Sequence, residues 1–564
     1  MRNNRFLWVL CLFLAAGVQG RAAEPRDCQG ADLVVRNANI VTMDGAQRIA
    51  QALAVRDGKV VAVGSNEEVA ACAGQNTETL DLGGKTVLPG LIDVHTHALD
   101  WGKNIVRNEL DLTYPNVQSV ADVVRLVRER AAARGAGAWV TGVGWSDSRL
   151  AERRYLTRHD LDAASPQNPV YLLHVSGHLA VANSAALERA GVTRETPTPE
   201  GGVIEHDAAG EPTGILKDNA MALVWRLLPG DPPDLAVRAA KLVSEEALKV
   251  GLTTIHDISL SPADMSAYQE ARRSGGLRLR VQMSPVVSTV AEAEQLAAQG
   301  LHTGFGDDSL KLGAVKMFAD GGMAARTVAI YPPAVEGEPE NFGLLIWKTE
   351  DMQKAHRLLA AAGWQLTTHA IGDRAIDQVL DSYTATMKAL ALTAPRFRIV
   401  HCGISTPAIQ KRLRELNVLV DGDPPFAYWI GSWFLRYGPE RVRWSYPGKS
   451  YVENGIIAGG GSDVPVTPIS PWWGIWAGVV RREINTGEIL APEERLTVPE
   501  VLTLYTRNGA TIGWEEDRKG SLEPGKLADF IVVDRDVLAI PPDELKNVQV
   551  LMTFVDGALV YRKP

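Results

Sequence analysis

The sequence predicts an α/β fold: a (β/α)8 TIM-like barrel flanked by a β-sandwich that both chain ends build. Three observations lead to this prediction. Short apolar segments alternate with amphipathic segments between residues 87 and 510, which is typical of a parallel sheet covered by helices. Hairpin signals between alternating apolar residues occur near both ends of the chain. The length of 564 residues suits one barrel with additions.

Both chain ends have the pattern of short strands and turns that is typical of small β-sheets. We expect the N-terminal part of the sandwich over residues 24–86 and the C-terminal part over residues 511–564. In the first, Asp57-Gly58 separates two alternating apolar runs and predicts a tight hairpin turn. Asp556-Gly557 follows a similar run near the C-terminus. Two such ends can pack on each other beside the barrel.

The barrel itself is expected over residues 87–510. Its first and second strands are separated by far more chain than one helix needs, so we expect an insertion at about residues 102–229. Long loops in a compact domain are usually lids or binding loops. The eight strands are expected at residues 87–95, 252–257, 277–283, 314–319, 365–369, 398–401, 418–421 and 456–462.

The start of the chain has the pattern of a signal peptide, which we place at residues 1–20. Arg2 and Arg5 precede an apolar run that is too short to span a bilayer, and small residues follow it. An uncleaved anchor is the alternative. The sequence thus predicts an exported protein, periplasmic or secreted, without membrane attachment after cleavage. The net charge of −9, without a basic stripe, argues against a nucleic-acid partner.

Signal cleavage would leave three cysteines. Export permits a disulfide, and Cys28 with Cys72 is the expected pair, although spacing alone leaves two free thiols open. Cys402 directly follows a histidine and is expected to be a small buried residue.

Potential metal ligands stand at the ends of several predicted strands. His95 and His97 close the first strand and share one of its faces, because alternate side chains on a strand point the same way. His369, His401 and Asp463 close three later strands. Barrel enzymes carry their chemistry at this face, and imidazole and carboxylate groups bind divalent metals. The sequence therefore predicts a metal site, against the alternative of incidental histidines.

Lys316 lies inside an apolar strand. A bare buried ammonium is costly, so the lysine must pair, lose its charge or be modified. A carbamate on Lys316 would be a bridging carboxylate between two metals. An ion pair with Asp320 is the alternative.

Several longer motifs extend this pattern along the chain. They are Pro89-Gly-Leu-Ile-Asp-Val-His-Thr-His97, Gly177-His-Leu-Ala-Val-Ala-Asn183-Ser, Gly-Glu211-Pro-Thr-Gly, Phe-Ala-Asp320-Gly-Gly, His369-Ala-Ile-Gly-Asp373-Arg374, Gly461-Ser-Asp463-Val-Pro and Lys519-Gly-Ser-Leu-Glu-Pro-Gly. With them, residues 31 to the C-terminus resemble the metal-dependent amidohydrolase superfamily. The resemblance is strongest to amidohydrolase family 3, the branch that includes N-substituted formamide deformylases.

The resemblance implies a role for each potential ligand. His95 and His97 would bind the more buried metal, and His369 and His401 the second. Lys316 would bridge the two as a carbamate. Asp463 would touch the first metal and act as the general base. The chain departs from the family pattern at Val400, where a glutamate is common, and in the acidic run Asp421-Gly-Asp423.

These features predict a metal-dependent hydrolase that cleaves a C–N bond by metal-activated water. The expected substrate is a small-molecule amide: N-acyl, N-formyl or cyclic. The expected cofactor is a divalent metal, zinc before others, at one or two per chain. The sequence leaves open whether the protein forms a homodimer. An aminohydrolase (deaminase) of a heterocycle and a non-catalytic binding protein are the alternatives. Candidate substrate contacts are His178, Arg374, Trp101 and Asp373, although an Asp373–Arg374 pair could equally be structural.

Overall fold

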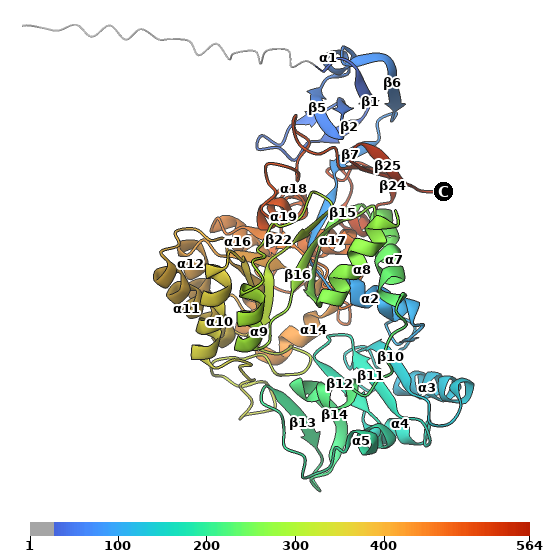
Figure 1. Ribbon diagram of the computed structural model, residues 1–564, viewed down its shortest axis with the longest axis vertical. Coiled ribbons are helices and arrows are strands. Elements are labelled where there is room, and N and C mark those ends of the chain that lie inside the picture. Colours follow the sequence, from blue (N-terminus) through green and yellow to red (C-terminus); the bar gives the residue numbers. More distant parts are fainter. Residues whose placement is uncertain (1–27) are drawn as a thin grey trace, which may run out of the picture.

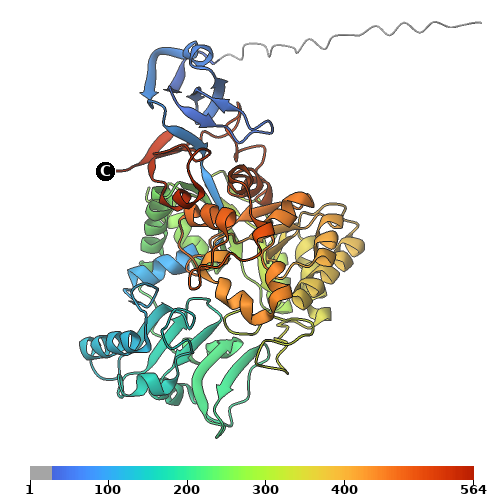
Figure 2. The same ribbon diagram turned by 180° about the vertical axis from the view of Figure 1, so that it is seen from behind.

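A computed structural model describes residues 28–564 of the chain (Figure 1). The predicted signal peptide lies outside the described residues. The described chain has three parts in a row: two β-sheets at one end, an α/β barrel in the middle and an inserted α/β unit at the other end (Figures 1 and 2). Within residues 28–564 we find no helix with the length and apolar character needed to cross a membrane.

The middle part is a barrel of parallel strands. Two sheets contribute, with strand orders β17-β16-β15-β8 and β18-β19-β20-β21-β22. A bridge between Val286 and Lys316 joins them on one side. On the other side the backbone N–H of Asp463 donates to the carbonyl of His95 at 2.9 Å. The strands are β8 (Leu91–Thr96), β15 (Leu252–Leu260), β16 (Arg280–Pro285), β17 (Leu310–Leu312), β18 (Val315–Phe318), β19 (Leu366–Ala370), β20 (Arg398–His401), β21 (Leu419–Gly422) and β22 (Ala458–Gly460).

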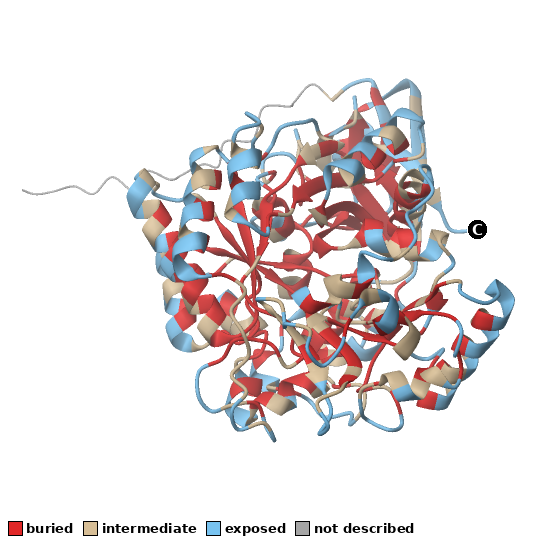
Figure 3. Ribbon diagram, turned by 60° about the horizontal axis from the view of Figure 1, so that its bottom comes forward, coloured by how far each residue is buried: buried red, intermediate tan, exposed pale blue. Residues whose placement is uncertain are grey.

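Amphipathic helices cover the outside of the barrel. Each has residues buried against the strands and residues exposed to solvent, as the burial colours of Figure 3 show. Ser261 illustrates how a helix begins, because its hydroxyl accepts the backbone N–H of Asp264 in a capping box. The helices are α2 (Ala98–Val106), α7 (Leu235–Lys249), α8 (Pro262–Arg273), α9 (Val290–Ala297), α10 (Thr349–Ala361), α11 (Asp373–Leu390), α12 (Pro407–Glu415), α16 (Gly448–Glu453), α17 (Pro471–Val480), α18 (Val498–Leu504) and α19 (Arg507–Ile512).

The first barrel strand differs from the prediction. The apolar run over residues 87–95 is two strands, because the chain leaves one sheet and enters another at Gly90. Before it, β7 (Thr86–Pro89) pairs with β2 and β23 of the flanking sheet, and after it β8 joins the barrel. A Cβ on Gly90 would lie 2.2 Å from Thr253 Oγ1, so only glycine fits this crossing. The third strand begins at Arg280 and not at residue 277.

The flanking part combines strands from both chain ends in one sheet of order β25-β24-β23-β7-β2-β3, beside a second of order β5-β4-β1-β6. A shared apolar core includes Leu33, Val55, Phe530 and Phe554. The hairpin predicted at Asp57-Gly58 joins β4 to β5, and a disulfide joins Cys28 to Cys72. The strands are β1 (Ala31–Arg36), β2 (Asn39–Val41), β3 (Ile49–Ala50), β4 (Ala52–Arg56), β5 (Lys59–Gly64), β6 (Ala73–Asp81), β23 (Phe530–Val533), β24 (Val550–Val555) and β25 (Ala558–Arg562).

The inserted unit follows α2 and has apolar cores of its own. Its sheet has the order β13-β14-β12-β11-β10-β9, and it lies at the end of the molecule away from the flanking sheets (Figure 1). Its elements are β9 (Leu110–Asp111), α3 (Val120–Arg134), β10 (Val140–Trp145), α4 (Arg158–Asp162), β11 (Val170–His174), β12 (Leu179–Ala182), α5 (Ser184–Ala190), β13 (Gly202–His206), β14 (Pro212–Asp218) and α6 (Ala222–Trp225).

Candidate metal centre

Four of the predicted ligands gather at the carboxyl ends of the barrel strands. The imidazole centroids of His95 and His97 are 5.5 Å apart, and those of His95 and His401 are 4.8 Å apart. His369 extends the cluster, since its ring centroid lies 4.7 Å from that of His401. The structure thus brings histidines at the carboxyl ends of β8, β19 and β20 into one group, with His97 directly after β8.

Asp463 completes this group from the turn after β22. Its Oδ1 lies 3.1 Å from His95 Nε2 and 3.5 Å from His97 Nε2. Asp93 holds the turn in place: its carboxylate accepts the backbone N–H of Ser462 at 3.1 Å and that of His95 at 3.0 Å. One buried carboxylate therefore fixes the ends of β8 and β22 against each other. This role of Asp93 was not predicted, although Asp93 lies in the motif Pro89–His97, two residues before His95.

Lys316 projects from β18 and is completely buried. Its Nζ has no hydrogen-bond partner among the described residues and lies 4.6 Å from the centroid of the Phe318 ring. The alternative ion pair with Asp320 is wrong, because that carboxylate instead accepts the backbone N–H groups of Ala329, Ile371 and Gly372 at 2.9 to 3.0 Å. Burial lowers the pKa of Lys316 to about 7 despite nearby carboxylates, so a large fraction of the amine is neutral at neutral pH.

The residues present fit a metal ion. Among residues 28–564, Nδ1 of His95 and Oδ1 of Asp423 are buried without a hydrogen-bond partner, and the contact of His95 Nε2 with Asp463 lacks hydrogen-bond geometry. Buried polar atoms normally have hydrogen-bond partners. Several unpaired ones in one place therefore indicate a bound group with which they interact. Burial lowers the pKa of His97 to about 4 and the pKa values of His95 and His401 well below the usual range. These imidazoles are therefore neutral, which is the form that binds metals.

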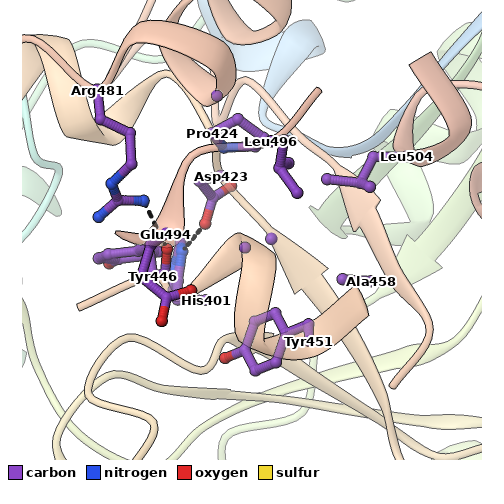
Figure 4. Close-up of a pocket in the computed structure, with 13 residues that line it drawn as sticks. His401, Asp423, Pro424, Tyr446, Tyr451, Ala458, Arg481, Glu494, Leu496 and Leu504 are labelled. Atoms are coloured by element: carbon purple, nitrogen blue, oxygen red, sulfur yellow. Dashed lines mark hydrogen bonds and ion pairs between the residues drawn. The ribbon is translucent and has the colours of Figure 1, made fainter. Parts of the chain in front are cut away.

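Asp423 belongs to this centre although it was not predicted as a site residue. Its Oδ2 lies 2.7 Å from His401 Nδ1, at the wall of a cavity of about 30 Å³ (Figure 4). Burial raises the pKa of Asp423 well above the usual range. The other acid of the run, Asp421, forms a fully buried ion pair with Arg398 at 2.6 Å. Of the two acids that depart from the family pattern, Asp421 is therefore structural and Asp423 lies at the candidate metal centre. Val400, the other departure, is buried in β20.

The predicted substrate residue His178 reaches the centre from the inserted unit. Its ring centroid lies 5.1 Å from that of His369, and its Nδ1 lies 2.8 Å from Asp218 Oδ1. A Cβ on Gly322 would lie 2.7 Å from the His178 ring, so this glycine makes room for the histidine. The contact gives a physical reason for the Asp320-Gly-Gly322 motif. Asp218 was not predicted, because the sequence does not show that β14 ends beside His178.

Comparisons with known proteins agree with this geometry. A model of the amidohydrolase family matches residues 78–561. The chain belongs to the amidohydrolase family. It is 30% identical to the N-substituted formamide deformylase of Arthrobacter pascens over 94% of this chain and 98% of that protein. It is 31% identical to the Arabidopsis thaliana protein LONG AFTER FAR-RED 3, over 94% and 92% of the two chains.

A solved structure supports the same assignment. An uncharacterized metal-dependent hydrolase from Pyrococcus horikoshii superposes with a TM-score of 0.71 at 26% identity, over 91% of this chain and 99% of that one. The resemblance to amidohydrolases that the motifs indicate is therefore confirmed.

The remaining candidate substrate contacts of this amidohydrolase have other partners. Asp373 accepts the backbone N–H groups of Tyr331 and Arg374, each at 3.0 Å. The guanidinium of Arg374 donates to the carbonyl of Phe342 at 3.2 Å. Both side chains therefore hold the loop after β18. Trp101 lies in α2 one turn beyond His97 and packs, half-buried, on the barrel core.

Asp423 gives a direct test of how the chain holds His401. We expect Asp423→Asn to weaken metal binding about ten- to a hundredfold, because a carboxylate on the far nitrogen of a ligating imidazole fixes the ring's tautomer and orientation. Competition with a chromogenic chelator measures the affinity. Asp381→Asn, an exposed carboxylate on α11, is the control. Equal affinities for wild type and Asp423→Asn would remove Asp423 from the metal centre.

Proposed function

We propose that this member of the amidohydrolase family is a metal-dependent hydrolase that cleaves the C–N bond of a small-molecule amide, whether N-acyl, N-formyl or cyclic. The observation that carries the proposal is the buried cluster itself. Neutral imidazoles and the carboxylate of Asp463 converge beside an unpaired, buried lysine. The name of the Arthrobacter pascens relative supports an amide as the substrate class.

Each ligand has a place in this proposal. His95, His97 and Asp463 would hold one metal, since their ligand atoms all lie within 4.8 Å of one another. His369 and His401 would hold a second. The mixture of imidazole and carboxylate suits zinc. A bound zinc ion supplies a water whose pKa is about 7 and polarises a carbonyl.

Lys316 would bridge the two metals as a carbamate. Its neutral amine would add to the carbon of CO2: the N–C bond forms as one C–O π bond opens to an oxyanion, and one N–H proton leaves to solvent, so that a neutral side chain becomes an anion. The burial of Nζ without a partner supports this step, because an unmodified lysine would leave that atom unsatisfied. The product would be a carbamate, an anionic oxygen ligand that the unmodified lysine cannot provide.

Two side chains would act on the substrate: Asp463 would transfer the proton, and His178 would contact the substrate. Asp463 accepts a proton from the attacking water and then donates it to the leaving nitrogen, which balances the hydrolysis to a carboxylic acid and an amine. His178 would contact the substrate through Nε2, since Asp218 occupies its Nδ1. The burial of His95, His401 and Asp463 excludes bulk water from the reacting atoms.

The test is the release of amine from a panel of N-formyl and N-acyl amines. We expect the zinc-loaded protein to release stoichiometric amine and acid, and chelator-treated protein to be inactive until zinc is restored. Release of ammonia from heterocyclic amines, with no amide cleaved, would instead identify a deaminase. Metal binding without any turnover on either panel would contradict an enzymatic role and favour a binding protein.

A further inference from the structure

The turn at residues 175–178, which joins β11 to β12 of the inserted unit, brings His178 to the metal centre. His178 ends this turn and packs beside His369, in the space that Gly322 leaves. The position of the turn therefore decides where the His178 imidazole lies. Backbone hydrogen bonds hold both ends of this part-exposed turn: the N–H of Val175 donates to the carbonyl of Trp145, and the carbonyl of His178 accepts the N–H of Asp218, each at 2.9 Å.

Side-chain hydrogen bonds hold the turn. Ser176 Oγ accepts the backbone N–H of His178 at 3.2 Å and lies 2.9 Å from His174 Nδ1. The backbone N–H of Ser176 also donates to His174 Nδ1, at 3.1 Å. A backbone N–H can only donate, so this nitrogen is unprotonated and the Ser176 hydroxyl donates to it. In the neutral ring the proton is then on Nε2.

Nε2 of His174 faces a buried carboxylate. Asp147 Oδ1 lies 3.4 Å from it, a polar contact that lacks hydrogen-bond geometry, and Asp147 Oδ2 pairs with Arg436 Nη2 at 2.6 Å. Burial alone would raise the pKa of Asp147, but His174 and Arg436 lower it to about 2, so the carboxylate stays charged at neutral pH. Arg436 lies in the 3-10 helix Leu435–Tyr437, in the loop after β21. The contacts therefore run from that barrel loop into the inserted unit.

Aromatic packing fixes the ring in the middle of this series. Trp145 meets the His174 imidazole edge-on at 4.7 Å, and Trp433 lies 5.6 Å away on another side. The His174 and Asp147 side chains are 0% and 2% exposed. A ring enclosed in this way is held in one orientation. Through its hydrogen bond it therefore also orients the Ser176 hydroxyl.

We propose that Asp147, His174 and Ser176 form a positioning relay that holds His178 at the metal centre, with Arg436 linking the relay to the loop after β21. The proposal rests on the proposed function and adds the residues that position its substrate-binding histidine. The order carboxylate, imidazole, hydroxyl is also that of a nucleophilic triad. Here the hydroxyl oxygen accepts the N–H of His178 and the imidazole lone pair is shared with a backbone N–H, so both are engaged in the turn.

The kinetic test is a double-mutant cycle with the full, zinc-loaded chain. We expect Ser176→Ala to lower kcat about tenfold, because it removes the hydroxyl's hydrogen bonds to His174 Nδ1 and to the N–H of His178, with metal content and KM little changed. Ser176→Thr keeps the hydroxyl and should restore kcat. In a His178→Ala background Ser176→Ala should cause no further loss, because the relay acts through His178. Additive losses in the two backgrounds would overturn the relay.

A second measurement needs no substrate. Diethyl pyrocarbonate modifies free imidazole nitrogens, and peptide mass spectrometry follows its rate at His178. We expect a faster rate in Ser176→Ala, the wild-type rate in Ser176→Thr, and no change in Thr193→Ala, which alters an exposed turn of the same unit. An unchanged rate in Ser176→Ala would overturn the relay even in an active enzyme. The expected rates in a chain that cleaves no amide would refute only the proposed function.

Discussion

Replacing Asp463 by asparagine is expected to lower turnover by about a hundredfold or more, the range of general acid–base catalysis, while the metal content per chain stays unchanged. Asp463 is the carboxylate that lies 3.1 Å from His95 Nε2 and 3.5 Å from His97 Nε2. Asparagine keeps an oxygen at this position and can still approach a metal. It cannot accept the proton of the attacking water, so the loss should be in kcat.

Steady-state kinetics and elemental analysis on the same preparation measure the two quantities. Asp381→Asn removes an exposed carboxylate of α11 and should leave both unchanged. More than a tenth of wild-type turnover in Asp463→Asn would contradict its role as general base. Loss of metal together with turnover would show that Asp463 acts mainly as a ligand.

Replacing Lys316 by methionine is expected to reduce the metal content from two ions per chain to one or fewer. Methionine fills most of the volume of the buried lysine, so the strand should keep its packing while the bridging group is lost. Lys316→Ala should give the same loss with a larger decrease in thermal stability, because it also leaves a cavity. Elemental analysis measures the stoichiometry, and thermal unfolding separates the two variants.

The carbamate can also be observed directly. Incubation with ¹³C-bicarbonate should give a carbamate carbon signal in wild type and none in Lys316→Met. Two metal ions per chain in Lys316→Met would refute the bridging role. Full stoichiometry in wild type without a carbamate signal would show that an unmodified lysine lies between the ions.

The sequence predicts the barrel and the convergence of the ligands because both follow from local patterns. Apolar segments at regular intervals define parallel strands, and parallel strands bring their carboxyl ends to one face. That rule alone places His95, His369 and His401 together. The closing of the first strand against the last, through Asp93 and Ser462, needs the three-dimensional structure.

The contributions that the sequence could not predict all arise between distant segments. The apolar run through Gly90 is continuous in the sequence, but the chain changes from one sheet to another within it. An apolar pattern predicts a strand and does not show which neighbouring strand it pairs with. Asp423 was visible as an unusual acid, but only the packing of β20 beside β21 brings it to His401. The pairing of Asp147 with Arg436 joins residues 289 positions apart, and no local pattern encodes such a contact.

The measurement that tests the central claim most directly is the transition-metal content per chain of the purified protein, by elemental analysis. The account predicts two ions per chain, held by the histidines, Asp463 and the modified Lys316. A single ion would retain a metal-dependent hydrolase and remove the bridging lysine from it. No bound metal, even after zinc and bicarbonate are added, would contradict the account.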